Sequence, residues 1–409
     1  MSTSSVTRIA VCFLLAVAIA KTAAAATEKS DDKNSLVVLQ AAQRIAGVPP
    51  EMLTRAHLDV DWPFSDLLVD DSDRVTQLFY HRGQLFVYSR NGLLFALDAE
   101  NGNINWAKVL PYSGMDQPPV SYFENTLAIL MGNTYVELRL ADGEYTNQME
   151  LPFDVSTSVA RNDVNLFAGD NKMRFYAVRL QDAVPMWRSV CKTSPTGRVA
   201  INDRFAYFTT VADRLVVTDI DTGRIAWEAD ITGRLCGLVL DRNELFIPSQ
   251  NTSLYCLDST SGERRWKVLC GGVLEELPTV MPDLVYQHVA QKSLLCLERQ
   301  SGQLVWELPL GKTLLARNGD HSYVITLDNE LTLMNNATGQ RVVSFFLRNV
   351  TLHTTNLEDS RIFLASPQGD ILTLRPLRPV EPTFKVREPT ATESENTPDG
   401  QSDLDESVL

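Results

Sequence analysis

Short apolar runs alternate with polar turns along most of the chain, and this pattern repeats. The clearest copies read LFALDAENGNINW, LVVTDIDTGRIAW, LYCLDSTSGERRW and LLCLERQSGQLVW, which end at Trp106, Trp227, Trp266 and Trp306. Each copy begins with an apolar run of strand length, passes through a polar turn that contains glycine, and resumes as a second strand. Glycine suits such a turn because it adopts positive φ without steric cost. Each copy therefore predicts a β-hairpin.

Weaker copies fill the gaps between the clear ones. YVELRLADGEYTN contains Gly143, FYAVRLQDAVPMW has Ala183 in the glycine place, and LTLMNNATGQRVV contains Gly339. The seven glycine-equivalent positions are 102, 143, 183, 223, 262, 302 and 339, with spacings of 41, 40, 40, 39, 40 and 37 residues. Two more apolar runs precede each hairpin, as at 75–81 and 84–90. A period near 40 without helical segments predicts one four-stranded sheet per copy, which is a β-propeller blade.

The strand count predicts eight blades. Residues 362–376 supply an eighth pair of strands, and the prolines that follow end sheet pairing there. Trp62 lies 44 residues before Trp106, so an N-terminal strand can complete the last blade and remove the open edge of the ring. Local closure by residues 383–386 is the alternative. Both routes give an all-β, eight-bladed propeller of four-stranded antiparallel blades over residues 57–383.

Tryptophan recurs at one register of the repeat, where it can hardly be a surface residue each time. We expect these side chains to be buried between neighbouring sheets and to dock blade against blade. A stacking platform for a ligand is the alternative. The residues are Trp62, Trp106, Trp187, Trp227, Trp266 and Trp306.

The N-terminal 56 residues differ from the repeat. Residues 1–26 contain an early arginine, a twelve-residue apolar run and a small-residue tract, which predict a secretory signal peptide. The run is too short to span a bilayer. Cys12 lies at the start of that run, which argues against a lipoprotein acceptor. Residues 27–56 form an N-terminal segment with one short amphipathic helix, which we expect to pack on the propeller rather than on a membrane. Its apolar stripe is Leu36, Val37, Leu39, Ala42 and Ile45.

The chain is acidic, with 37 Lys and Arg against 51 Asp and Glu and a formal net charge of −14. Residues 384–409 contain seven acids and two bases among polar residues, which predicts a disordered acidic tail. Without the signal peptide and the tail, residues 27–383 still have a net charge of −11. This balance disfavours nucleic acid as a partner and favours proteins.

Cysteine usage gives no support to a disulfide framework or a zinc site. Five cysteines follow the signal peptide, and no Cys-x-x-Cys spacing occurs. Four of the five recur at fixed places in the repeat, so we interpret them as small buried hydrophobic residues. The five are Cys191, Cys236, Cys256, Cys270 and Cys296.

The string Ala96-Leu97-Asp98 to Gly102 to Trp106 resembles the repeat of the pyrroloquinoline-quinone-like (PQQ-repeat) propellers. WD40 propellers are disfavoured because no Trp-Asp pair occurs. The resemblance implies three kinds of protein: quinone-cofactor dehydrogenases, the propeller component of the outer-membrane β-barrel assembly machinery, and envelope propellers without assigned chemistry. The dehydrogenases have adjacent cysteines and inserted loops, and this chain has neither.

Propeller geometry predicts where a binding surface would lie. Segments that run from each repeat tryptophan into the next blade are expected to end at the mouth of the central channel. The polar side chains seven to eleven residues after the tryptophans would form a ring of mixed charge there, able to dock a peptide or a small polar ligand. They are Asp116, Gln117, Arg198, Arg234, Glu275, Glu276 and Arg317.

Our leading hypothesis is an exported, non-enzymatic and monomeric propeller that acts as a protein-interaction scaffold at the periplasmic or cell-envelope surface, with no cofactor and no bound metal. A dehydrogenase that uses PQQ and calcium is one alternative. A binding module for a small polar ligand or a glycan is the other.

Overall fold

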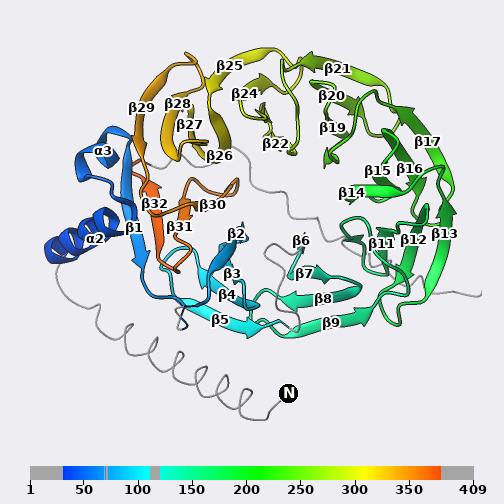
Figure 1. The fold of residues 1–409 in the computed structure, drawn as a ribbon, viewed down its shortest axis with the longest axis horizontal. Helices are drawn as coiled ribbons and strands as arrows, with labels where there is room; N and C mark the ends of the chain where they lie inside the picture. Colours follow the sequence, from blue (N-terminus) through cyan, green and yellow to red (C-terminus); the bar gives the residue numbers. More distant parts are fainter. Residues whose placement is uncertain (1–30, 69, 71, 111–119, 379–409) are drawn as a thin grey trace, which may run out of the picture.

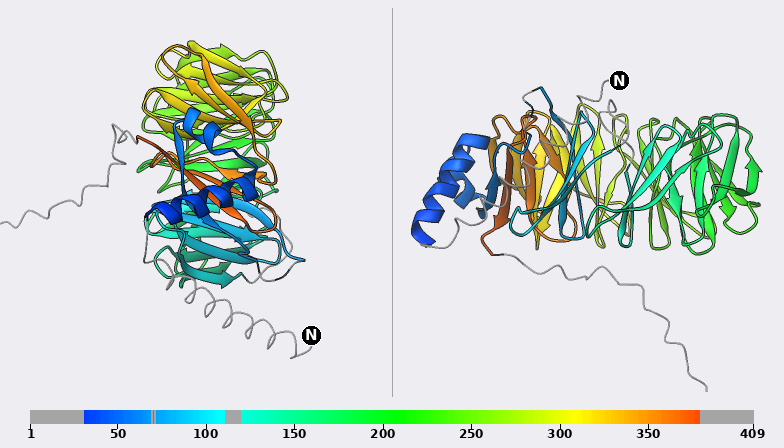
Figure 2. Two further views of the ribbon diagram at one scale, coloured as in Figure 1. Left: turned by 90° about the vertical axis from the view of Figure 1, so that its left-hand side faces the viewer. Right: turned by 90° about the horizontal axis from the view of Figure 1, so that it is seen from below.

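The computed structural model describes residues 31–68, 70, 72–110 and 120–378, and its core is a ring of eight four-stranded antiparallel sheets (Figure 1). The prediction of an eight-bladed propeller is confirmed. Seen from the edge, the ring is a flat disc with two faces (Figure 2). Two helices lie against its outer side, α2 (Asp31–Ala46) and α3 (Pro50–Arg55).

In every blade the first strand lines the channel and the fourth lies at the outer edge of the ring (Figure 1). Blade 1 contains β2 (Val75–His81), β3 (Gln84–Ser89), β4 (Leu93–Asp98) and β5 (Ile104–Val109); blade 2 contains β6 (Val120–Phe123), β7 (Thr126–Met131), β8 (Thr134–Arg139) and β9 (Tyr145–Glu150). Blade 3 contains β10 (Ala160–Arg161), β11 (Asn165–Gly169), β12 (Arg174–Arg179) and β13 (Pro185–Val190); blade 4 contains β14 (Pro195–Ile201), β15 (Phe205–Thr210), β16 (Arg214–Asp219) and β17 (Ile225–Asp230).

The second half of the ring has the same strand order. Blade 5 contains β18 (Val239–Asp241), β19 (Glu244–Ser249), β20 (Ser253–Asp258) and β21 (Arg264–Leu269); blade 6 contains β22 (Thr279–Val280), β23 (Leu284–Val289), β24 (Ser293–Glu298) and β25 (Leu304–Pro309). Blade 7 contains β26 (Gly311–Asn318), β27 (His321–Thr326), β28 (Glu330–Asn335) and β29 (Arg341–Phe346); blade 8 contains β30 (Leu352–Thr354), β31 (Ile362–Ala365), β32 (Ile371–Pro376) and β1 (Leu58–Phe64).

Each repeat glycine lies under the tryptophan of the preceding blade. Gly102 has φ +74°, and a Cβ atom placed there would lie 2.6 Å from the ring of Trp62. The indole N–H of Trp62 donates to the carbonyl of Ala99 in the same turn, at 2.9 Å. Equivalent ring contacts join Gly143 to Trp106, Gly223 to Trp187, Gly262 to Trp227 and Gly302 to Trp266, whereas at Gly339 the nearest atom is the Cβ of Trp306, at 3.3 Å. Tryptophan therefore joins six of the eight pairs of neighbouring blades, and glycine provides the space for its ring.

The seam between blades 2 and 3 has no tryptophan. Asn147 occupies that place, and its amide N–H donates to the carbonyl of Leu180 at 2.8 Å, as an indole would. The facing turn has Ala183, at φ +58°, instead of glycine. A Cβ atom is tolerated there because the smaller asparagine leaves room for it. An ion pair between Glu137 and Arg161, 2.6 Å long and largely buried, also joins these two blades.

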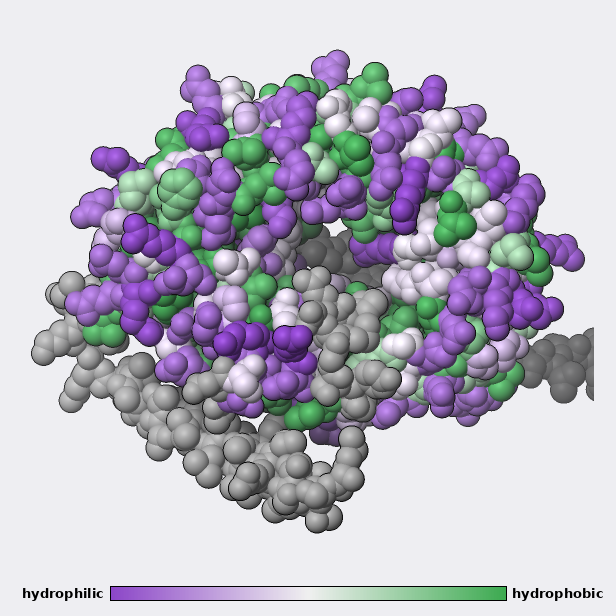
Figure 3. Space-filling view, in the orientation of Figure 1, coloured by the Kyte–Doolittle hydropathy of each residue, from purple (hydrophilic) through white to green (hydrophobic). Residues whose placement is uncertain are grey.

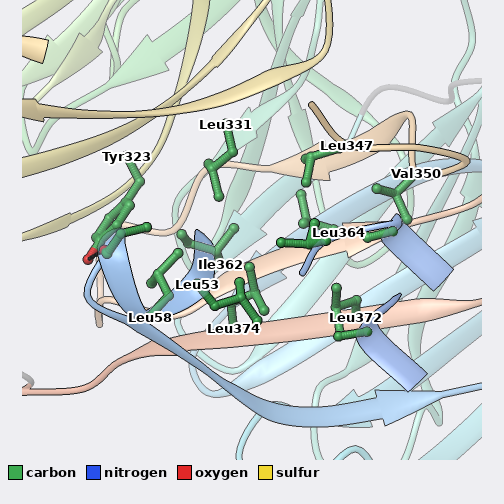
Figure 4. Close-up of a cluster of buried hydrophobic side chains, with 14 of the residues drawn as sticks. Leu53, Leu58, Tyr323, Leu331, Leu347, Val350, Ile362, Leu364, Leu372 and Leu374 are labelled. Atoms are coloured by element: carbon green, nitrogen blue, oxygen red, sulfur yellow. Dashed lines mark hydrogen bonds between the residues drawn. The ribbon is translucent and has the colours of Figure 1, made fainter. Parts of the chain in front are cut away.

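The seam between blades 7 and 8 also lacks tryptophan, and the N-terminal helices fill it. Leu53 and Ala56 pack with Leu331 of blade 7 and Leu364 of blade 8 in one buried cluster (Figure 4). The hydroxyl of Tyr323 donates to the carbonyl of Ala56 at 3.2 Å. The N-terminal segment thus fills the seam between blades 7 and 8.

Strand β1 completes blade 8 by pairing with β32, from Leu58 opposite Pro376 to Phe64 opposite Ile371. Closure from the N-terminus is therefore confirmed. The signal peptide, the alternative closing segment 383–386 and the acidic tail lie outside the described residues. No helix in the described part of the chain is long and apolar enough to cross a membrane.

The N-terminal segment differs from the sequence expectation in two details. A second helix, α3, follows the first, since Pro50 suits the first turn of a helix. Val37, expected on the apolar stripe, is 64% exposed, whereas Ala42, Ile45 and Ala46 are buried. The residues of α2 that contact the ring therefore lie in the C-terminal half of the helix, where it meets blades 7 and 8.

Candidate functional site

The two faces of the ring carry different connections. We call the face with the links between blades, such as 191–194, 231–238 and 270–278, the link face, and the face with the repeat glycine turns the glycine face. The strand order places the start of each channel strand at the link face and its end at the glycine face. This polarity locates each predicted site residue.

Arg234, Glu275 and Glu276 lie in the links that precede blades 5 and 6, on the link face. Arg234 and Glu275 flank Cys236 with opposite effects on its thiol, whose pKa is raised chiefly by burial. The Glu276 carboxylate lies 3.4 Å from Nδ1 of His288, and this hydrogen bond holds the pKa of Glu276 below its usual value.

Arg317 does not lie on the link face. The link before β26 is the single residue Leu310, so counting eleven residues from Trp306 reaches the far end of the channel strand. Arg317 lies there, at the glycine face, and forms a bidentate ion pair with Asp283 at 2.5 and 2.8 Å. The predicted ring of charge is wrong at this position because the links differ in length. Asp116 and Gln117 lie outside the described residues.

Arg198 lies on β14 inside the channel, where it lines a cavity of about 460 Å³. Figure 3 shows the ring hollowed at its centre. The cavity extends toward the glycine face, because most of its lining residues lie at the ends of channel strands or just beyond them. They are Tyr80, His81, Tyr122, Arg198, Val239, Leu240, Asp241, Leu277, Pro278, Thr279, Val280, Thr355, Leu357 and Glu358.

Sequence reasoning missed the aromatic part of this wall. The rings of His81 and Tyr122 lie 4.6 Å apart, and Nδ1 of His81 lies 3.5 Å from the carboxylate of Glu358. The signal available was the polar and aromatic ending of channel strands, as in FYH at 79–81 and SYF at 121–123. In the sequence alone, these endings cannot be told from ordinary strand residues.

The described residues contain no group of three His, Cys, Asp or Glu side chains placed to hold a metal ion. Burial raises the pKa of the Cys191, Cys256 and Cys296 thiols to about 12, so at neutral pH they are protonated and poor nucleophiles. Cys236 is half-buried and the other four cysteines are buried, with no disulfide among the five. This fits the interpretation of the cysteines as small core residues.

Three exposed apolar side chains lie on the link face near the link where blade 3 joins blade 4. Met173, Val190 and Val211 are 46%, 67% and 62% exposed. Backbone hydrogen bonds fix all three around the link 191–194: Cys191 N–H to the Met173 carbonyl at 2.8 Å, and Val211 N–H to the Ser194 carbonyl at 3.0 Å. We call these three residues the 3/4 patch. Exposed apolar side chains that gather near one link are typical of protein-interaction sites.

Three comparisons relate the chain to known proteins. The family described as "Outer membrane protein assembly factor BamB" matches residues 69–229, 214–313 and 250–378. The protein of that name from Yersinia pestis is 22% identical over an alignment of 201 positions, which covers 44% of this chain and 50% of that protein. The match to this curated relative therefore spans about half of its length.

Solved structures share the fold at low identity. The crystal structure of BamB from Moraxella catarrhalis gives a TM-score of 0.57 at 16% identity, covering 81% of this chain and 99% of that one. The computationally designed Ika8 protein gives 0.59 at 12% identity, with 75% and 97% covered, and the C-terminal WD40 domain of Sif2 gives 0.61 at 11% identity, with 78% and 97% covered. These likenesses concern the propeller fold alone. Since the family matches run from residue 69 to residue 378 and coincide with the ring of blades, the chain belongs to the BamB family of PQQ-repeat β-propellers.

Proposed function

We propose that this protein is an exported, non-catalytic scaffold that binds other proteins during outer-membrane protein assembly at the cell envelope. The observation that carries the proposal is the family match over residues 69–378, which includes almost the whole ring. The acidic charge of the chain and its rigid, tryptophan-docked blades agree with a protein that presents surfaces to partners.

The 3/4 patch is the surface that we propose for the partner. Its three side chains lie on turns and a strand end that are fixed by backbone hydrogen bonds, so little conformational entropy is lost when a partner covers them. The ion pair between Lys192 and Glu228, at 3.1 Å, borders the patch and supplies a polar rim. An apolar centre with a polar border is the usual anatomy of a protein interface.

The experiment is site-specific photocrosslinking in cells of the source organism. A Val211→p-benzoylphenylalanine variant is expected to crosslink to a component of the outer-membrane assembly machinery, identified by mass spectrometry. The matched control is the same substitution at Ile225, which is 42% exposed at the opposite, glycine-face end of its blade. Adding Val190→Asp should abolish the Val211 crosslink, because it places a charge in the apolar centre.

Equal crosslinking from Val211 and Ile225, or a Val211 crosslink only to proteins unrelated to outer-membrane assembly, would contradict the proposed role. Export is tested separately by fractionation and by sequencing the N-terminus of the mature chain. We expect a periplasmic or envelope protein that begins near residue 27. Recovery of the chain from the cytoplasm with residues 1–26 intact would contradict export.

A further inference from the structure

The channel cavity has two chemically distinct walls. One is aromatic and cationic, with His81, Tyr122 and Arg198 from blades 1, 2 and 4. The other is aliphatic, with Leu240 and Leu277 from blades 5 and 6. A volume of about 460 Å³ lies within the range of roughly 300–1,000 Å³ that is typical of small-molecule sites. The cavity therefore has the size and the amphipathic lining of a ligand site.

The acidic groups of the cavity are already engaged. Asp241 pairs with Arg299 at 2.5 Å. Glu358 accepts the backbone N–H of Arg82 at 2.9 Å and faces Nδ1 of His81. Neither carboxylate needs a cation from a ligand.

Arg198 differs from these two carboxylates, which already have charged or hydrogen-bonding partners. Among the residues that the structure describes, no carboxylate forms an ion pair with it, and Tyr122 is the charged or ionisable neighbour that acts on it. Its side chain is exposed to the channel solvent, and the crowding of the channel walls around it lowers the pKa of the guanidinium. An anion that entered the cavity could therefore reach Arg198 and form a charge-assisted hydrogen bond with it.

The backbone that holds Arg198 is tightly packed. Gly197 precedes it with φ +76°, and a Cβ atom at Gly197 would lie 3.2 Å from the Cα of Gly237 in the next blade. A Cβ atom at Gly237 would in turn lie 3.2 Å from the side chain of Leu277 in blade 6. Two glycines therefore let three consecutive channel segments approach closely, which fixes the backbone of Arg198 beside the aliphatic wall.

We propose that this cavity binds a small aromatic carboxylate, whose carboxylate pairs with Arg198 and whose ring lies between the His81–Tyr122 pair and the aliphatic wall. Arg198 has no carboxylate partner among the described residues, so one carboxylate on the ligand would match it. Aromatic pairs at centroid distances of about 4.5–7 Å are favourable, and the adjacent His81 and Tyr122 rings offer an edge and a face for a third. This inference is independent of the scaffold role, since the 3/4 patch lies on the link face, outside the cavity.

The test is isothermal titration calorimetry on the mature chain with indole-3-propionate, and with indole-3-propionamide as the uncharged isostere. The carboxylate should bind at least tenfold more tightly than the amide. Arg198→Gln should remove that preference and leave the amide affinity unchanged. The control is Arg234→Gln, an exposed arginine on the link face, which should keep the full preference. Circular dichroism melting curves establish that each variant is folded.

Three results would overturn the proposal. They are equal affinity of the wild-type chain for acid and amide, retention of the preference by Arg198→Gln, and absence of binding by the wild-type chain at millimolar concentration. If Arg198→Gln melts well below the wild type, Tyr122→Ala replaces it as the test variant. Tyr122→Ala should weaken the binding of both probes about tenfold, because it removes part of the aromatic wall.

Discussion

The pairing of glycine with tryptophan predicts a specific pattern of destabilisation. Gly223 has φ +70°, and a Cβ atom there would lie 2.4 Å from the ring of Trp187. Gly83 has nearly the same φ, +72°, but a Cβ atom there would meet nothing within 4 Å. Gly83→Ala therefore measures the cost of the backbone conformation alone, and Gly223→Ala adds the clash with the indole ring.

The magnitudes follow from these two contributions. Placing an L-residue in the left-handed region costs about 1–2 kcal/mol, so Gly83→Ala should lower the free energy of unfolding by that amount. Overpacking against a fixed ring adds about 1–3 kcal/mol, so Gly223→Ala should cost about 2–5 kcal/mol. The natural Asn147 and Ala183 pair predicts the remedy. In a Trp187→Asn background the clash disappears, and the additional cost of Gly223→Ala should fall to that of Gly83→Ala.

The assay is urea unfolding followed by circular dichroism, with a double-mutant cycle for positions 187 and 223. A coupling free energy of about 1–3 kcal/mol is expected, in the direction that makes the double variant more stable than the sum of the single ones. Additive costs, or equal costs for Gly83→Ala and Gly223→Ala, would refute the explanation of the repeat glycine as space for tryptophan.

Three further predictions concern the core and its titration. At pH 8 a disulfide reagent should leave the four buried thiols of the native chain unreacted and modify all five after denaturation. Their pKa values of about 11 or 12 leave at most roughly one thiolate in 10³; rapid native reaction would contradict their burial. Burial lowers the pKa of His353 to about 4, below its unfolded value of about 6.5, so the unfolded chain binds the extra proton. Stability should fall as pH drops from about 6.5 toward 4, and His353→Gln should flatten this part of the urea-midpoint profile; an unchanged profile would be inconsistent with a buried neutral imidazole. Leu53→Ala, in the helix that fills the seam between blades 7 and 8, should cost about 2–5 kcal/mol in urea unfolding, whereas Val37→Ala on the exposed face should cost less than about 0.5 kcal/mol; equal costs would mean that the helix does not contribute to the seam.

The ring could be predicted from the sequence because its determinants are local and repeated. A glycine turn and a tryptophan at a spacing near 40 specify the hairpin, the strand count and the contact between blades. The sequence favoured N-terminal closure because Trp62 has the same register as the other repeat tryptophans, but it left local closure by residues 383–386 open. The seam without tryptophan was harder to predict. In the sequence Asn147 and Ala183 look like degenerate residues, and only the fold shows that they face each other across one seam, where the small asparagine leaves room for the alanine.

The candidate site was harder to predict because it depends on link lengths. A fixed count from each tryptophan reached the link face before blades 5 and 6, the channel interior at Arg198 and the opposite face at Arg317. Distance along the chain gives no information about which residues from six blades meet in the channel. Tyr122 and Glu358 are far apart in the sequence and meet only when the ring closes.

The most direct test of the proposed role is the amount of folded outer-membrane protein in cells that lack this chain. We predict a reduced amount, restored by the wild-type chain and by the Ile225→Asp control, and not restored by the Val190→Asp variant of the 3/4 patch at equal abundance. Unchanged outer-membrane protein levels without the chain, or full restoration by Val190→Asp, would contradict the account of this propeller as an assembly scaffold that docks through its link face.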